Sequence, residues 1–360
     1  MIYLGTFLIA IALSAILTVA VIKLAKFWKV YDQPNQERKI HQQNIPLLGG
    51  LAIYLTFAAV AVALGFGLDK LFGGYLLVKH LLSLLLGGSI IMLGGFLDDK
   101  YRLKPHQQFI WPLIASLVIV AGGIGVSYLR NPFGSAIQLD NWNFKLFEWQ
   151  ENPYKITLWS DLFTIAWLLG MSYTTKFLDG LDGLVAGITG IASLFLFTLS
   201  LSSEVNQPET ALLLIIFAGA SLGFLFFNFN PAKIFLGEGG SIFMGFALGV
   251  LAIISGGKVA TALLLLGIPI LDAAWVISQR LYKGRKVTEA DQRHLHFQLL
   301  SLGLTVKQTV ILLYAITAIF GALALASETT GKVWLLSALV LLMIVIAAVV
   351  LKIKKRKTSQ

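Results

Sequence analysis

The sequence contains no cysteine among its 360 residues, and charged residues make up only 13% of it. The absence of cysteine excludes disulfide bonds, thiol nucleophiles and thiolate metal sites. A soluble domain has about 25% charged residues, so the low charge content argues against a soluble protein. Hydrophobic residues make up 57% of the chain, and the mean hydropathy is +0.81. These values predict an integral membrane protein.

The charges that are present have an excess of positive sign, with a formal net charge of +10. In a membrane protein such an excess marks cytoplasmic loops and contact with anionic lipid. We therefore expect the bilayer as a partner, and no nucleic acid.

Apolar runs of about 18 residues or more, each long enough to cross a bilayer, recur along the whole chain. They predict an all-α, polytopic membrane helix bundle, forming a single transmembrane domain over residues 1–360. No basic region precedes residues 2–22, so we expect a first span there rather than a cleaved signal. The eleven predicted spans are 2–27, 46–67, 75–97, 109–129, 158–176, 184–203, 210–229, 240–256, 258–281, 308–327 and 332–352.

The distribution of Lys and Arg predicts an external N-terminus and a cytoplasmic C-terminus. In that orientation, 21 of the 28 basic residues lie on or beside the inner connections and the tail, as the positive-inside rule requires. Partial alternation of apolar and polar residues predicts a small external hairpin near 130–157. Glycine pairs at small-xxx-small spacing, such as Gly219/Gly223 and Gly245/Gly249, indicate close helix packing. The inner connections that contain polar clusters are 28–45, 98–108, 177–183, 230–239 and 282–307.

Five polar clusters interrupt the apolar runs, and the predicted orientation places all of them in the cytoplasm. The first lies within 32–50 and contains Arg38-Lys39-x-His41. Arginine and lysine are natural partners for phosphate, although an ordinary positively charged anchor loop is the alternative. The second is Asp98-Asp99, at the end of the third span. Adjacent acids at a membrane edge can bind a divalent cation, or one can act as a base; a solvated helix end is the alternative.

The third and fourth clusters combine acids with glycine. Residues 179–183 hold two Asp-Gly pairs, which suit a site where a cation or polar ligand approaches the backbone closely, or a simple polar turn. In 228–241, a helix opening after Glu238 would offer free amides to phosphate. Glu238 itself is a hard oxygen ligand of the kind Mg²⁺ accepts. Phe235 could stack on a base, or be an aromatic residue at the membrane edge.

The fifth cluster runs from the ninth span into the long loop. It contains Asp272 and Arg280, followed by Asp291, His294 and His296. A carboxylate at the membrane depth of Asp272 is a functional candidate. The two histidines have no third nitrogen ligand nearby, so phosphate contact suits them better than zinc, and a surface histidine pair is the alternative.

Together, the order and spacing of these motifs resemble those of a known family. The resemblance rests on Asp98-Asp99, Asp179-Gly-Leu-Asp182-Gly-Leu, Asn228-Phe-Asn230-Pro-Ala, Phe235-Leu-Gly237, Pro269-x-x-Asp272 and Asp291-x-x-His294-x-His296. From about residue 28 to 300, the chain resembles the polyprenyl-phosphate N-acetylhexosamine-1-phosphate transferases, the MraY/WecA-like family of glycosyltransferase 4 type. The single His294-x-His296 pair is similar to the N-acetylglucosamine branch, whereas the muramoyl-pentapeptide branch has a denser histidine run.

The resemblance implies a Mg²⁺-dependent enzyme of the plasma membrane, with Mn²⁺ as a substitute metal. It would transfer N-acetylhexosamine-1-phosphate, with GlcNAc-1-phosphate as the first choice, from a UDP-sugar to polyprenyl (undecaprenyl) phosphate. UMP would leave, and a lipid-pyrophosphoryl sugar for cell-wall or surface polysaccharide synthesis would form at the cytoplasmic face. The implied partners are the UDP-N-acetylhexosamine, the polyprenyl phosphate and the bilayer, and a homodimer is left open.

Residue roles carry over from the resemblance by position. Asp98, Asp99 and Asp182 would be catalytic, and Asp99 and Glu238 would bind metal. The residues expected to bind substrate are Lys39, His41, Asp179, Gly180, Asn228, Phe235, Asp272, Arg293, His294 and His296.

The chain departs from the family pattern at four positions. Lys176 stands where asparagine is usual, Glu238 replaces aspartate, Phe297 stands where a further histidine is common, and Gln108 falls near a usual lysine. Two other hypotheses stay open. One is the same reaction with UDP-MurNAc-pentapeptide or another amino-sugar donor. The other is a transporter or a non-catalytic lipid-binding relative, which is disfavoured because the polar residues gather at one face and no inverted repeat is seen.

Overall fold

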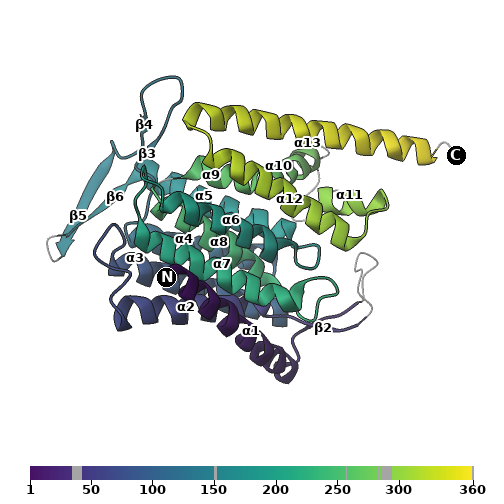
Figure 1. The fold of residues 1–360 in the computed structure, drawn as a ribbon, viewed down its shortest axis with the longest axis horizontal. Coiled ribbons are helices and arrows are strands. Elements are labelled where there is room, and N and C mark those ends of the chain that lie inside the picture. The colour runs from purple at the N-terminus through teal and green to yellow at the C-terminus, as the bar shows by residue number, and fades with distance from the viewer. Residues whose placement is uncertain (35–42, 150–151, 257, 283, 285–293, 359–360) are drawn as a thin grey trace.

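The computed structural model describes residues 1–34, 43–149, 152–256, 258–282, 284 and 294–358. Figure 1 shows a bundle of helices with small strands at its two ends. The helices are α1 (Ile2–Trp28), α2 (Gly49–Val62) with a π-helical extension (Ala63–Gly67), α3 (Val78–Tyr101), α4 (Pro105–Ala121), α5 (Leu158–Leu178), α6 (Leu184–Ser200), α7 (Pro208–Asn228), α8 (Gly237–Ile254), α9 (Val259–Leu265), α10 (Gly267–Tyr282), α11 (Leu295–Ser301), α12 (Val306–Leu325) and α13 (Thr329–Thr358). The strands are β1 (Tyr31–Asp32), β2 (Ile45–Pro46), β3 (Tyr128–Leu129), β4 (Ile137–Gln138), β5 (Asn143–Trp149) and β6 (Asn152–Thr157).

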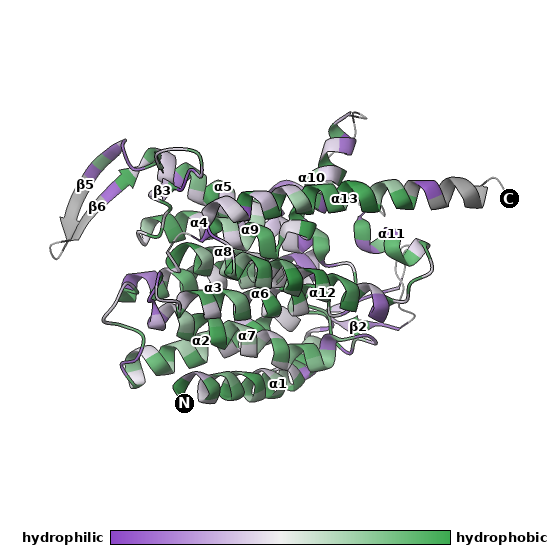
Figure 2. Cartoon of the chain, turned by 45° about the horizontal axis from the view of Figure 1, so that its top comes forward, coloured by the Kyte–Doolittle hydropathy of each residue, from purple (hydrophilic) through white to green (hydrophobic). Residues whose placement is uncertain are grey.

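Within the described residues, seven helices are long and apolar enough to cross a membrane, or eight if the bent pair α9 and α10 forms one span. The seven are α1, α2 with its extension, α3, α7, α8, α12 and α13. The helices α4, α5 and α6 occupy the remaining predicted spans, and α4 and α6 are only 17 residues long. Figure 2 shows the apolar character continuing along these helices. The chain is therefore a mostly helical, multi-pass membrane protein, while the count of eleven crossings stays a prediction.

The predicted ninth span, 258–281, is not one helix. It consists of α9 and α10, which are bent by 78° relative to each other. Gly267 and Pro269 lie directly at the break. Proline lacks the amide that would continue the hydrogen-bond ladder and clashes with the preceding turn, so it breaks a helix here. The predicted span is therefore interrupted by a sharp bend, which gives α10 its own direction (Figure 2).

The helix α8 lies at the centre of the bundle, and all of its residues except Glu238 are buried. It packs against α2, α3 and α5. Glycine makes this close packing possible, because a Cβ on Gly245 would lie 2.1 Å from the Met171 carbonyl oxygen of α5. The pair Gly219 and Gly223 serves α7 and α1 in the same way, with added Cβ atoms 2.7 and 2.4 Å from carbonyl oxygens of α1. The predicted role of these glycines in helix packing is confirmed.

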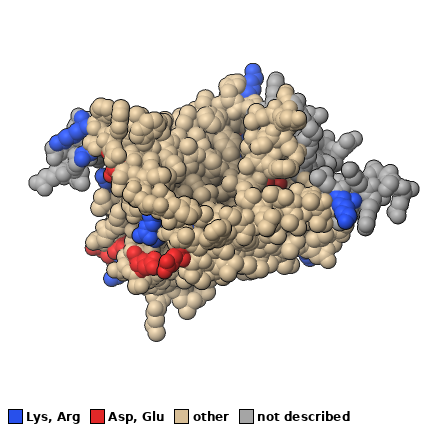
Figure 3. Space-filling model, turned by 90° about the horizontal axis from the view of Figure 1, so that it is seen from above, with Lys and Arg blue, Asp and Glu red and all other residues tan. Residues whose placement is uncertain are grey.

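Two antiparallel hairpins occupy the region where one was predicted. The strands β3 and β4 pair, and β5 and β6 pair with Asn143 opposite Thr157. Figures 1 and 2 both place these hairpins at the opposite end of the bundle from β2 and α11. In the face shown in Figure 3, charged side chains lie mainly toward the two ends. The hairpin is confirmed, and the side of the membrane on which it lies stays a prediction.

Candidate active site

The adjacent acids Asp98 and Asp99 end α3 and have different environments. The Asp98 carboxylate is buried and accepts hydrogen bonds from Leu103 N (2.7 Å) and Gln108 Nε2 (3.2 Å). Leu103 lies in the connection between α3 and α4 and Gln108 lies at the start of α4, so Asp98 fixes the turn between these two helices. Asp99 instead crosses to α8, where the Glu238 amide donates to both of its oxygens at 3.1 and 3.2 Å. Of the two acids, Asp98 bonds to the segment that follows α3 in the chain, and Asp99 bonds to the distant helix α8.

The contact between Asp99 and α8 occupies the helix N-terminus that the sequence predicts as a phosphate site. The helix begins at Gly237, two residues before the predicted Gly239, and Gly237 has a φ of 75°. A Cβ on Gly237 would lie 2.5 Å from Asp99 Oδ2, so glycine serves both the backbone conformation and the approach of the carboxylate. An acid at a helix N-terminus is favourable, and here Asp99 supplies it.

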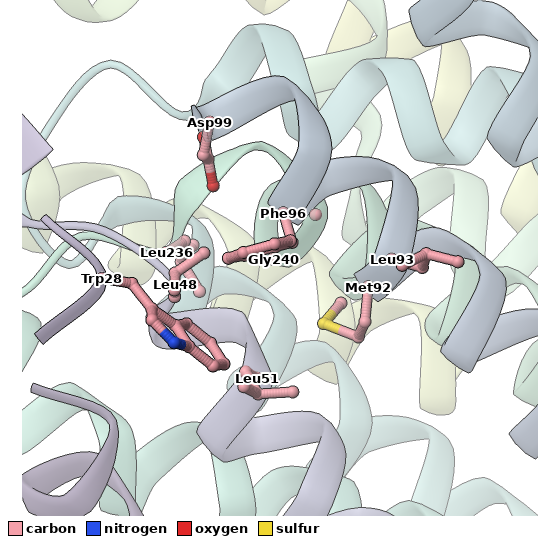
Figure 4. Close-up of a pocket in the computed structure, with 10 residues that line it drawn as sticks. Trp28, Leu48, Leu51, Met92, Leu93, Phe96, Asp99, Leu236 and Gly240 are labelled. Atoms are coloured by element: carbon pink, nitrogen blue, oxygen red, sulfur yellow. The ribbon is translucent and has the colours of Figure 1, made fainter. Parts of the chain in front are cut away.

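Asp99 also borders a hollow of about 200 Å³ that is otherwise apolar. Figure 4 shows Asp99 at its edge, with Trp28 of α1, residues of α2 and α3, and the start of α8 around it. The apolar lining is formed by Trp28, Leu48, Leu51, Met92, Leu93, Phe96 and Leu236, with Gly239 and Gly240. A carboxylate beside an apolar hollow suits an amphiphilic ligand with a polar head.

A chain of polar contacts joins α5, α8, the start of α4 and the end of α3. The Lys176 ammonium forms an ion pair with Glu238 and donates to Gln108 Oε1 at 2.9 Å. Gln108 Nε2 in turn donates to Asp98 and to the Leu103 carbonyl. Three of the four departures from the family pattern, at 108, 176 and 238, therefore lie in one network.

The Asp179–Gly183 segment is tied to the turn that follows α7. The Asp182 carboxylate accepts from Asn230 Nδ2 (2.8 Å) and from Ala232 N (3.0 Å). The buried Asn228 side chain accepts from Gly183 N at 3.1 Å and donates to the Ile234 carbonyl at 2.9 Å. The oxygen and the nitrogen of this side-chain amide each have a partner within the protein, so Asn228 acts here as a brace between two loops. Its predicted contact with substrate stays a prediction.

Asp179 is an exposed residue, but its carboxyl group lies among other acids. Desolvation by the surrounding protein, together with the negative charges of Glu238, Asp182 and Asp32, raises its pKa to about 8. Asp99 also experiences the like charges of Glu238, Asp98 and Asp179. Such a concentration of carboxylates favours the binding of a cation.

The histidine pair is held by Asp272 from the broken helix. The Asp272 carboxylate lies 2.8 Å from His294 Nδ1 and accepts a 2.8 Å hydrogen bond from Leu295 N. The His294 ring stacks between Phe177 and His296, with centroid distances of 6.0 and 5.7 Å. The separate direction of α10 places the Asp272 carboxylate at the start of α11. There its two hydrogen bonds fix the position of His294.

The His296 ring packs against Gly180 of the Asp179–Gly183 segment. It is 1% exposed, and its Nε2 atom is buried without a hydrogen-bond partner. A Cβ on Gly180 would lie 2.3 Å from that Nε2 atom, so only glycine lets the ring approach so closely. Burial, together with the charge of His294, lowers the pKa of His296 to about 3. The ring is therefore neutral at ordinary pH, and its free nitrogen faces the loop backbone.

The structure brings most of the predicted site residues into one connected set. Direct contacts link Asp99 with Glu238, Asp182 and Asn228 with the 230–234 turn, and Asp272 with His294, while His296 lies against Gly180. Phe235 pairs through its backbone with Pro46 and Gly49. Lys39, His41 and Arg293 lie outside the described residues.

Sequence reasoning missed several residues of this set as site residues. Asn230 stands within a quoted motif, but nothing in the sequence indicates its bond to Asp182. Tyr314 of α12 donates to the Gly183 carbonyl, and its place in an apolar run gives no signal at all. Lys176 and Gln108 were noted as departures, but their contact could not be foreseen from positions 68 residues apart.

The comparisons with known proteins agree with this picture. A sequence model of the family described as glycosyl transferase family 4 matches residues 81–256. A probable undecaprenyl-phosphate N-acetylglucosaminyl 1-phosphate transferase of Bacillus subtilis is 28% identical over 353 residues, which cover 96% of this chain and 90% of that protein. A decaprenyl-phosphate N-acetylglucosaminephosphotransferase of Mycolicibacterium smegmatis is 31% identical over 316 residues, covering 80% and 73%. A phospho-N-acetylmuramoyl-pentapeptide-transferase of Pelotomaculum thermopropionicum is 28% identical over 350 residues, covering 89% and 96%.

Proposed function

The chain belongs to glycosyl transferase family 4, and from this we propose that it transfers GlcNAc-1-phosphate from UDP-GlcNAc to a polyprenyl phosphate. The products are UMP and a lipid-pyrophosphoryl sugar. The reaction takes place at the end of the bundle where α3 and α5 end and α8 begins, which we assign to the cytoplasmic face of the plasma membrane. The names of the relatives in Bacillus and Mycolicibacterium support both the sugar and the lipid acceptor.

The observation that carries the proposal is the position of Asp99. It borders the apolar hollow on one side (Figure 4), and on the other it meets the polar cluster through the Glu238 amide. An acceptor with an isoprenoid tail and a phosphate head needs such a junction. We assign the first isoprene units to the hollow, and the acceptor phosphate to the neighbourhood of Asp99. In this position Asp99 could take the phosphate proton as a general base.

The donor occupies the polar side of this junction. The Asp179–Gly183 segment, braced by Asn228 and closed by His296, forms the wall for the nucleotide sugar. His294 is held by Asp272 and stacks on Phe177, which lies two residues before the Asp179–Gly183 segment. Burial of the histidines keeps bulk water from this wall, which protects the donor from hydrolysis.

We assign Mg²⁺ to the carboxylates of Asp99 and Glu238. Within the described ranges, no group of three His, Asp or Glu side chains is arranged to hold a metal. Mg²⁺ commonly takes only one or two carboxylates and completes its shell with water and substrate phosphates, so the oxygen donors here fit a site that the donor pyrophosphate completes. When bound, the metal would neutralise charge on the pyrophosphate during phosphoryl transfer.

The test is UMP release by the purified full-length protein in detergent. We expect release only when UDP-GlcNAc, a polyprenyl phosphate and Mg²⁺ are all present, loss of it with EDTA, and recovery with Mg²⁺ or Mn²⁺. Asp99→Asn should reduce turnover by about 10²-fold or more without unfolding the protein. Failure to release UMP from every UDP-amino sugar, by a protein that is folded, would refute the proposal.

A second donor is favoured by one observation. The Pelotomaculum relative, named for phospho-N-acetylmuramoyl-pentapeptide transfer, aligns over 96% of its own length. A donor panel that includes UDP-MurNAc-pentapeptide decides between the two donors. A higher kcat/KM for the pentapeptide donor than for UDP-GlcNAc would show that GlcNAc is not the preferred sugar, and the proposed acceptor would stay the same.

A further inference from the structure

Lys176 places a positive charge inside the acidic cluster. It lies in the last turn of α5, and its side chain is 18% exposed. Its ammonium pairs with Glu238, whose side chain is 23% exposed. A positive charge held against a carboxylate neutralises it, so Glu238 has a counter-ion before any metal arrives.

The ammonium is also held from a second direction. Gln108 Oε1 accepts from it at 2.9 Å, and the amide of Gln108 is fixed in turn by Asp98 and the Leu103 carbonyl. The Tyr173 ring lies 5.6 Å from the same nitrogen. Lys176 therefore keeps two favourable neighbours if it leaves Glu238, because neither Gln108 nor Tyr173 depends on that pair.

Glu238 is joined through its amide to Asp99, so its carboxylate stands next to the acid that borders the lipid hollow. A divalent cation that binds Glu238 cannot share it with an ammonium at ion-pair distance, since the two positive charges would repel each other. Metal and lysine must exchange.

We propose that Lys176 is a built-in counter-cation of Glu238, that a divalent metal displaces it, and that the freed ammonium binds the pyrophosphate of the donor. The second half rests on the proposed function. Metal binding and nucleotide binding are then coupled through one side chain: phosphate attracts Lys176, and the departure of Lys176 opens Glu238 to metal. Such coupling is reciprocal.

The first experiment measures Mn²⁺ binding to the full-length protein in detergent, without nucleotide, from the EPR signal of the free ion. Lys176→Gln should bind Mn²⁺ about tenfold more tightly, the lower end of what one neighbouring charge does to a carboxylate. Lys176→Arg keeps the charge and should stay near the wild type. Lys104→Gln removes an exposed charge from the same end of the bundle and serves as the matched control. In a Glu238→Gln background, the gain from Lys176→Gln should vanish.

The second experiment repeats the titration with UDP, which carries a pyrophosphate but cannot transfer a sugar. UDP should raise the Mn²⁺ affinity of the wild type, and this enhancement should be about fivefold smaller in Lys176→Gln. An equal enhancement in both proteins would overturn the donor half of the proposal.

The main proposal is overturned if Lys176→Gln leaves Mn²⁺ affinity unchanged or weaker, or if its gain persists without Glu238. A merely structural ion pair would lower the melting temperature without tightening metal binding. Because the Mn²⁺ titration needs no acceptor, its outcome stands apart from that of the transfer reaction. Absent UMP release with the expected Mn²⁺ results would overturn the proposed function alone.

Discussion

The substitution Gly95→Ala tests whether the contact of α3 with α8 sets the geometry of the site. A Cβ on Gly95 would lie 2.1 Å from both Cα and N of Gly239. Ordinary contact begins near 3.4 Å, so the two helices must separate by about 1 Å or more. The backbone on both sides leaves no flexible side chain to yield, and overpacking of this kind costs about 1–3 kcal/mol of stability.

Gly95 lies four residues before Asp99, and Gly239 is adjacent to Glu238. Pushing the two glycines apart therefore also moves Asp99 away from Glu238. Their 3.1 Å hydrogen bond would lengthen beyond bonding distance. A misplacement of about 1 Å can cost about 10²-fold in rate, so we expect a loss of turnover of that order in a protein that still folds. Initial rates of UMP release and thermal unfolding in the same detergent measure the two effects.

Gly170→Ala is the matched control, because a Cβ there meets nothing within 4 Å and Gly170 also lies inside a helix. It should leave the rate unchanged and the melting temperature equal or slightly higher, since alanine is the better helix former. A Gly95→Ala protein with near-normal turnover would refute the reasoning, as would equal losses in both variants.

Three further predictions address the brace, the hollow and the buried histidine. Asn228→Ala leaves Gly183 N and the Ile234 carbonyl without their partner, and should cost about 1–3 kcal/mol for each buried group, measured by thermal unfolding; an unchanged melting temperature would contradict the brace. Leu51→Trp fills the hollow and should raise the KM for acceptor about tenfold with the donor KM unchanged, whereas Leu55→Trp, one turn along at an exposed position, should do neither. Because the pKa of His296 is lowered to about 3, the unfolded chain takes up a proton there below about pH 6.5 and the folded one does not, so the contribution of His296 to stability should fall by up to about 2 kcal/mol between pH 6.5 and 5. The raised pKa of Asp179 acts in the opposite direction over this range in both proteins, so the fall should show in thermal unfolding as a shrinking stability difference between the wild type and His296→Asn; a difference that does not change with pH would contradict it.

The helical architecture could be predicted because long apolar runs have few alternatives in a membrane. The break between α9 and α10 shows where that reasoning stops. Composition treats 258–281 as one apolar run, and only the direction of the chain after Gly267 and Pro269 reveals two helices. The extent of the hairpins was similarly underestimated, because alternation is weak in short, exposed strands such as β3 and β4.

The candidate site could be predicted as a set of residues but not as a set of contacts. Asp98 and Asp99 are adjacent and equivalent in the sequence, yet one fixes its own turn and the other crosses to α8. Asn228 is predicted to bind substrate, and the sequence gives no indication that its amide also joins two loops. Side-chain direction at a helix end decides such outcomes, and residue type alone does not specify it.

The departures at 108 and 176 lead to a final prediction, because the two side chains touch. The family resemblance implies a lysine near position 108 and an asparagine at 176, and the 2.9 Å contact between Gln108 and Lys176 leads us to expect that a cation on either member can serve the pair. Lys176→Asn alone removes the cation, and Gln108→Lys alone sets two ammonium groups against each other. Contacting residues are not additive, so the double variant Gln108→Lys/Lys176→Asn should regain much of the kcat/KM for UMP release that each single change loses. A double variant as poor as the product of the two single losses would show that the position of the charge, and not merely its presence in the pair, determines the activity.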